Sequence, residues 1–162
     1  MEPWLSGIIT GTHPVLAALL YSFQHARQDL DQWTRGFSDE QMWRKVGDVA
    51  PVGFHIRHIA GSVDRLITYA NNGSLDETQL KELRSEQESQ GQSRDDLFAL
   101  FDRKLAHAAE IVRGIDPSTL ADIREIGRKK VPVPLGVLLV HISEHTQRHV
   151  GEAIVTAKIV RV

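Results

Sequence analysis

The sequence predicts an all-α protein, namely an antiparallel four-helix bundle with short extra helices in its connections. Three observations support this fold class. Four long segments carry apolar residues at three- and four-residue steps, which is the period of an amphipathic helix. Strand-like alternation is weak and confined to one short stretch. The chain has 162 residues, of which 41% are hydrophobic, so we expect one domain over residues 1–162 with its own core.

Signals for helix ends divide the chain into its four long helices. Pro14 suits the first turn of a helix, and Ser93 suits an N-cap position. Gly73 and Gly114 follow helical patterns and suit helix C-termini. The long helices are therefore expected at about residues 12–33, 52–71, 93–114 and 134–160.

The connections hold shorter elements. Residues 38–41 read Ser-Asp-Glu-Gln, a capping-box pattern for a short helix that reaches Trp43. Residues 74–93 are polar and acidic, and we expect an exposed connector without a function, with a short helix at 77–83 followed by a mobile loop. Two prolines in residues 131–134 exclude a central strand, so we expect a loop with one short hairpin there.

Composition excludes several classes of function. The formal net charge is −2, which gives no electrostatic basis for binding nucleic acid. The absence of cysteine excludes disulfides, a thiolate nucleophile and any cysteine-ligated metal site. No apolar run approaches the roughly 20 residues of a membrane span, and residues 1–7 lack the basic region of a secretory signal. We therefore expect a cytoplasmic protein with no nucleic-acid or membrane partner.

Five of the eight histidines cluster on two predicted helices. His141, His145 and His149 follow one another at four-residue steps, so their imidazoles project from one stripe of the last helix. Two histidines four residues apart can chelate one ion, and a third ligand must then come from a neighbouring helix. His58 is the candidate for this ligand because it lies among apolar residues that should face the core. Spacing alone leaves open a metal-free core in which each imidazole has its own hydrogen-bond partner.

Two motifs around these histidines resemble one known family. Residues 52–60 read Val-Gly-Phe-His-Ile-Arg-His-Ile-Ala and are followed by Asp64 and Arg65, which is similar to the second helix of DinB/YfiT-like proteins. Residues 141–152 read His-Ile-Ser-Glu-His-Thr-Gln-Arg-His-Val-Gly-Glu, which is similar to that family's last helix, where histidines at four-residue steps end in His-Arg-Gly-Gln. The order and separation of the motifs also match, and the resemblance covers nearly the whole chain.

This resemblance implies a four-helix bundle that holds one divalent metal ion and commonly forms a homodimer. The ligands, carried over by position, are His58, His145 and His149. His141 takes an earlier position that is normally not a ligand. The chain departs from the family pattern after the last ligand, where Val150 and Glu152 stand in place of Arg and Gln. The contact that this Gln makes with a ligand or a partner subunit is therefore not carried over.

A three-histidine ion predicts the type of chemistry. Three neutral imidazoles leave a divalent ion its full charge and open coordination positions, at which it can activate a water or a thiol. Zn²⁺ suits three nitrogens, Ni²⁺ would bind more tightly at equal availability, and Mn²⁺ or Fe²⁺ less tightly. The thiol would be a small-molecule cosubstrate, because the chain has no cysteine. The resemblance also implies transferases that use low-molecular-weight thiols on an electrophilic substrate, or hydrolases.

Other roles remain open at this point. The sequence does not identify catalytic residues, but Arg148, Glu144 and Arg65 flank the ligands and could orient an imidazole or hold an anionic substrate group. The alternative for these three residues is surface ion pairing. The alternative function is a non-catalytic, metal-binding, dimeric bundle associated with stress. Its metal site would be closed by a fourth ligand, for which His141 and His55 are candidates.

Overall fold

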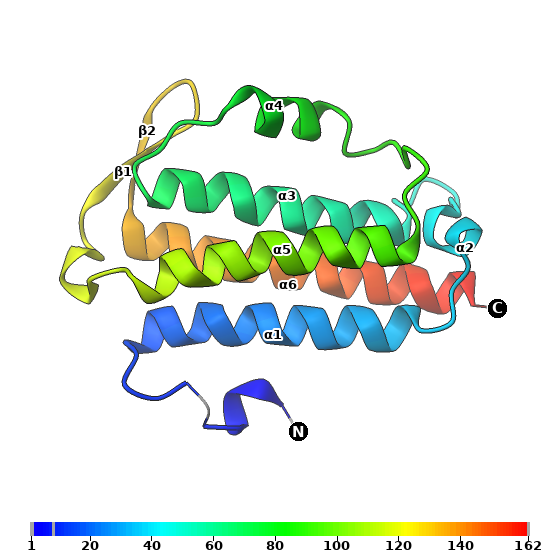
Figure 1. The fold of residues 1–162 in the computed structure, drawn as a ribbon, viewed down its shortest axis with the longest axis horizontal. Coiled ribbons are helices and arrows are strands. Elements are labelled where there is room, and N and C mark those ends of the chain that lie inside the picture. Colours follow the sequence, from blue (N-terminus) through cyan, green and yellow to red (C-terminus); the bar gives the residue numbers. More distant parts are fainter. Residues whose placement is uncertain (1, 8, 162) are drawn as a thin grey trace.

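The computed structural model describes residues 2–7 and 9–161, and it is mostly helical (Figure 1). The four long helices are α1 (Pro14–Thr34), α3 (Val52–Ala70), α5 (Arg94–Arg113) and α6 (Leu135–Val160). The two short helices are α2 (Asp39–Trp43) and α4 (Glu77–Arg84), and single 3-10 turns occur at Pro3–Leu5 and Pro117–Thr119. The two strands are β1 (Ile123–Ile126) and β2 (Val131–Pro134). No helix within the described residues is long and apolar enough to cross a membrane.

Capping residues mark the start of several helices. Capping boxes begin α2 at Ser38, α4 at Asp76 and α5 at Ser93, and each satisfies a backbone N–H that the first turn leaves without a helical partner. Gly114 follows the last residue of α5, as the sequence indicates. The predicted positions of all four long helices and both short helices are confirmed to within two residues.

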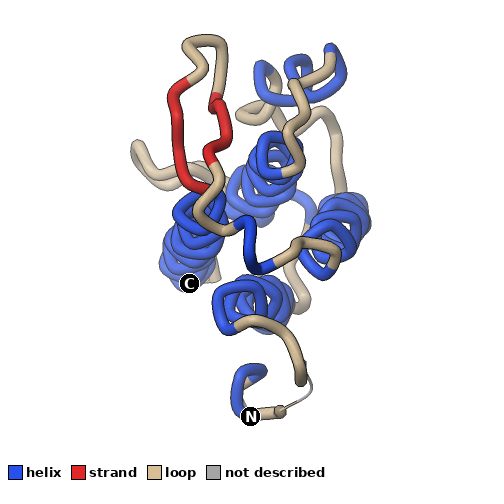
Figure 2. The backbone as a smooth tube through the Cα atoms, turned by 90° about the vertical axis from the view of Figure 1, so that its left-hand side faces the viewer, coloured by secondary structure: helices blue, strands red, loops and turns tan. Residues whose placement is uncertain are grey.

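The four long helices lie side by side around a common core, as the view in Figure 2 shows. α1 packs on α6 and α5, and α3 packs on α5 and α6. The colours in Figure 1 show that α1 and α6 run in one direction and that α3 and α5 run in the other. The mostly helical class is thus confirmed. The expected antiparallel order holds for the α3–α6 and α1–α5 contacts, whereas α1–α6 and α3–α5 are parallel because the long connector that carries α4 returns the chain before α5 begins.

The core consists of the apolar faces that the helical period identifies. Its largest fully buried members are Phe101, Leu19, Leu30, Met42, Ile56, Ile59, Ile67, Leu97, Leu135, Leu139 and Ile142. One part of the apolar pattern is not buried. Val137, Val140, Val155 and Ile159 of α6 are about half exposed, on a helix whose other side faces α1 and α3.

Two connections pack against the ends and side of the long helices. The hairpin pairs β1 with β2 antiparallel, and Arg124 in β1 donates from Nε to the carbonyl of Ala70 at the end of α3 (2.8 Å). The connector between α3 and α5 is held by buried Arg57, which donates to Ser85 Oγ, the Glu88 carbonyl and Gln90 Oε1. The loop after α4 is therefore attached to α3 and does not extend freely from it.

We predict that Gly53→Ala destabilises the protein, because a Cβ at this position would lie 2.8 Å from Cε2 of the Trp43 indole. Overpacking of this kind costs about 1–3 kcal/mol. Gly151→Ala is the matched control, since a Cβ there meets no described atom within 4 Å. The control should gain about 0.5–1 kcal/mol from helix propensity. Urea unfolding of both variants measures the difference, and equal effects would contradict the proposed clash.

Candidate metal centre

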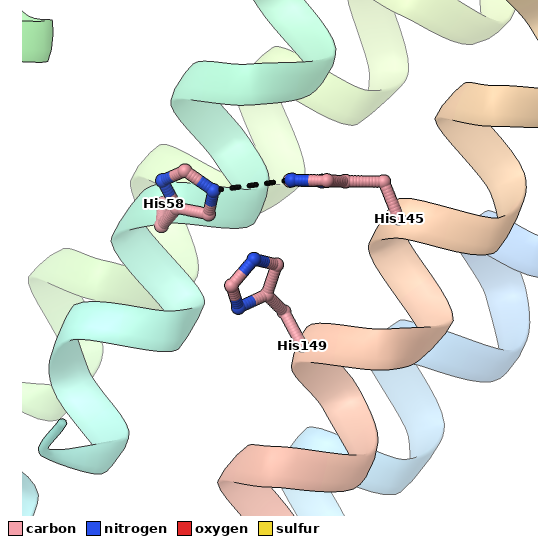
Figure 3. Close-up of side chains that lie close together, drawn as sticks. All are labelled: His58, His145 and His149. Atoms are coloured by element: carbon pink, nitrogen blue, oxygen red, sulfur yellow. Dashed lines mark hydrogen bonds between the residues drawn. The ribbon is translucent and has the colours of Figure 1, made fainter. Parts of the chain in front are cut away.

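Three imidazoles meet in the space between α3 and α6. Figure 3 shows His58 reaching from α3 toward His145 and His149 on α6. One ring nitrogen of each histidine lies within 4.8 Å of those of the other two, and Nε2 of His58 is 3.5 Å from Nε2 of His145. The structure therefore brings together the three histidines that the resemblance indicates as ligands.

Local helical geometry explains this convergence. His145 and His149 are four residues apart, so their rings lie one above the other on the face of α6 that packs against α3. His58 projects from α3 into the gap between them, and the ring of Phe54, one turn earlier, stacks on His58 at a centroid distance of 5.3 Å. The aromatic contact limits the positions that the His58 ring can take.

The donor set fits a divalent metal ion. Zn–N bonds of about 2.0–2.1 Å in a tetrahedral arrangement place two ligand nitrogens about 3.3 Å apart, close to the 3.5 Å between the Nε2 atoms of His58 and His145. Metal binding also requires neutral imidazoles. Burial lowers the pKa of His145 to about 4, with further contributions from His149 and His58, and burial likewise lowers the pKa of His149. Both rings are therefore neutral at pH 7 and present lone pairs.

Glu86 fixes the orientation of His58. Nδ1 of His58 lies 2.8 Å from Oε2 of Glu86, so the Nδ1–H donates to the carboxylate and the lone pair of Nε2 faces His145. A carboxylate bonded to the far nitrogen of a ligand histidine fixes its tautomer and makes it a stronger donor. The sequence provided no signal for this residue, because Glu86 lies in the polar connector to which we assigned no function. That assignment needs correction, since the connector contributes a side chain to the site.

Arg65 forms a buried ion pair with Glu86. Its Nη1 donates to Oε1 of Glu86 at 2.5 Å, and both side chains are buried. Burial acts to raise the pKa of Glu86, but the hydrogen bond from His58 and the charge of Arg65 outweigh it, so the pKa is lowered. Gly61 leaves room for this pair, because a Cβ there would lie 2.7 Å from Oε1 of Glu86. Of the three flanking residues proposed from the sequence, Arg65 thus reaches His58 through Glu86.

Glu144 and Arg148 instead pair with each other on the exposed side of α6. Both carboxylate oxygens of Glu144 accept from Nη2 of Arg148 at 2.9 Å. His141 is also exposed, and its Nδ1 lies 2.9 Å from Oε1 of Glu144. None of these three side chains belongs to the three-histidine group.

A second group lies directly beside the first. Nδ1 of buried His55 is 3.1 Å from Nδ1 of His149, and Oε2 of Glu152 lies 3.6 Å from His55 Nδ1 and 3.4 Å from His149 Nδ1. Burial lowers the pKa of His55 to about 4, His149 lowers it further, and Glu152 opposes the shift. His55 thus lies on the far side of His149 from His58, and it does not join the three-histidine group.

A pocket of about 480 Å³ adjoins the site at Phe54, whose ring contacts both His58 and His149. Lys45, Asp48 and Gln87 contribute polar groups to its wall. The rest of the lining comes from Gly47, Val49, Ala50 and Pro51. The pocket therefore offers a small molecule both apolar surface and charged groups beside the histidines.

The chain belongs to the DinB superfamily, whose family model matches residues 22–153. The match includes α3, α5 and the histidines of α6. A comparison with curated proteins finds no match. Membership of this superfamily and the group formed by His58, His145 and His149 together fit a metal-binding protein.

We predict that acid destabilises the metal-free protein through His55. The pKa of His55 is about 4 in the folded protein, and its ordinary value of 6.5 applies in the unfolded chain. As the pH falls, the unfolded chain therefore protonates at His55 before the folded protein does. Stability present above pH 6.5 is therefore lost as the pH approaches 4. Between about pH 7.5 and about pH 4.5, wild type should lose about 2.5 kcal/mol more than His55→Gln. Urea unfolding in the presence of a chelator measures both proteins, and parallel pH profiles would contradict the shift.

We predict a separable structural and metal-binding role for Glu86. Glu86→Gln leaves the buried Arg65 charge unpaired, which should cost about 3 kcal/mol. The same change weakens the anchoring of His58 and should lower metal affinity about 10–100-fold. The double variant Arg65→Met, Glu86→Gln should recover stability but not affinity. Glu82→Gln is the control on the same connector, where Glu82 pairs with Lys104. Full metal affinity in Glu86→Gln would contradict the orienting role.

Proposed function

We propose that this protein is a metal-dependent enzyme in which His58, His145 and His149 hold one divalent ion. The observation that supports this proposal is the convergence of three imidazoles from two helices, with ring nitrogens within 4.8 Å. Zn²⁺ or Ni²⁺ suits this donor set best, and Mn²⁺ or Fe²⁺ binds it more weakly. When bound, the ion would act as a Lewis acid that lowers the pKa of a thiol or a water at an open coordination position.

The chain's own residues prepare the site in three ways. Glu86 holds the proton on Nδ1 of His58 and leaves Nε2 free to bind. Arg65 keeps Glu86 ionised in a buried position. Phe54 shields one face of the His58 ring and borders the adjoining pocket.

The reaction that we propose is the transfer of a low-molecular-weight thiol, as nucleophile, to an electrophilic substrate. The alternative is hydrolysis, with water as the nucleophile. The adjoining pocket has room for a small molecule, and Lys45 offers a cation to an anionic group of a substrate. A thiol cosubstrate also implies a reducing compartment such as the cytoplasm.

An open position distinguishes this proposal from the non-catalytic alternative. A structural site needs a fourth protein ligand. His141 is engaged with Glu144 at the surface, and His55 contacts His149 from the opposite side. Among the described residues, the group around His58 contains three donors and no fourth. This arrangement favours a catalytic metal site over a structural one.

We also propose a homodimer, with α6 as the contact surface. Val137, Val140, Val155 and Ile159 expose apolar area on this helix, which a second copy would remove from water.

The first test is elemental analysis of the protein without a polyhistidine tag, before and after chelation. We expect about one equivalent of metal per chain and an affinity at least about 100-fold lower in His58→Ala, His145→Ala and His149→Ala. His107→Ala is the control, because His107 is exposed on α5. No metal in the wild type, and no uptake when metal is added, would contradict the proposal.

The second test measures consumption of a small thiol with an electrophile, and hydrolysis of activated esters. Activity should vanish on chelation, return when the ion is restored to the wild type, and fall more than about 100-fold in His145→Ala. A fully loaded protein without either activity would favour the non-catalytic alternative.

A further inference from the structure

The two nitrogens of His149 face two different groups. Figure 3 shows one nitrogen of this ring turned toward the space between His58 and His145, and the other turned away. The nitrogen turned away is Nδ1, which lies 3.1 Å from His55 Nδ1 and 3.4 Å from Glu152 Oε2. One imidazole therefore stands between two sets of potential metal ligands.

We propose that His55, His149 and Glu152 form a second site for a divalent ion, which shares His149 with the three-histidine site. The three donor atoms are 3.1, 3.4 and 3.6 Å apart. A tetrahedral ion with bonds of about 2.0–2.1 Å separates its ligand atoms by about 3.3 Å. Two imidazoles and one carboxylate are also a donor set that catalytic zinc sites use.

The surroundings of His55 support this assignment. Its side chain is 2% exposed, and its Nε2 makes no hydrogen bond of good geometry. A backbone group of Ala50 also interacts with this ring. With the ring proton on Nε2, the lone pair of Nδ1 faces His149 and Glu152, the other two donors of the site.

Glu152 gives the second site a negative charge and an exposed donor. Its side chain is 50% exposed, and its ion-pair partners among the described residues are His55 and His149, with no Lys or Arg at that distance. Together with His55 it lines a largely apolar pocket that also includes Val155 and Thr156. In the single chain the carboxylate thus faces solvent on one side and two imidazoles on the other.

Sharing one ring makes the two sites compete. A neutral imidazole carries one proton and therefore offers one lone pair, so His149 binds through Nε2 in the three-histidine site or through Nδ1 in the second. An ion in either site holds the proton of His149 on the nitrogen that faces the other. The competition rests on the proposed function, whereas the existence of the second site does not.

The test measures the affinity for Zn²⁺ and, by NMR of protein with ¹⁵N-labelled histidines, which ring nitrogen binds it. In wild type, Zn²⁺ should bind Nε2 of His149. His145→Ala removes one ligand of the competing site, so Zn²⁺ should then bind Nδ1 of His55 and His149, with an affinity about 100-fold or more below the wild type. Adding Glu152→Gln or His55→Gln to His145→Ala should lower affinity at least about 10-fold further. His145→Ala with Glu144→Gln is the matched control, and it should equal His145→Ala alone.

The outcomes separate the two proposals. The second site is overturned if His145→Ala binds no Zn²⁺, if Glu152→Gln leaves its binding unchanged, or if Zn²⁺ stays on Nε2 of His149. His58→Ala, checked for helical content by circular dichroism, repeats the experiment should His145→Ala fail to fold. Wild type that binds Zn²⁺ through Nδ1 of His149 would overturn the three-histidine site and leave the second site standing.

Discussion

The antiparallel contact between α3 and α6 is the interaction on which the site depends. It places His58 beside His145 and His55 beside His149, so that one helix pair supplies every imidazole of both groups. A shift of one residue along either helix would turn a side chain by about 100°, and the nitrogens would no longer meet. The apolar side chains around them, such as Ile59 and Ile142, fix this register because they fill the core.

The site carries a cost that the rest of the bundle must offset. Imidazoles held neutral by burial, and an ion pair between Arg65 and Glu86 removed from water, each disfavour the folded chain relative to apolar side chains of similar volume. Such groups persist where they serve a purpose other than stability. Their concentration beside α3 and α6 is the observation behind the proposed metal site.

Much of the fold follows from local features of the sequence. The helical period and local end signals indicate all six helices, since both act within a few residues of the chain; side-chain caps begin α1, α2, α4 and α5, whereas α3 and α6 follow Pro51 and Pro134. The four-residue spacing of His141, His145 and His149, with inward-facing His58, also indicates a candidate metal site, and the family resemblance selects His58, His145 and His149 among them. Glu86 could not be found in this way, because its contact with His58 spans 28 residues and begins in a polar connector that has no helical face. The relative direction of the helices and the exposure of Val137 and Val155 likewise depend on tertiary packing.

The attachment of Glu86 to a connector has a thermodynamic consequence. The proposed ligands lie on two long helices, whereas the carboxylate that orients His58 lies between α4 and α5, in a segment that Arg57 ties to α3. The affinity for an ion and the docking of this segment on α3 are therefore thermodynamically coupled. By reciprocity, an ion that favours the proton on Nδ1 of His58 strengthens the docked segment, and a molecule that binds the docked segment raises the affinity for the ion by the same factor. In the proposed metal site, the docking of this segment would thus depend on whether an ion is bound.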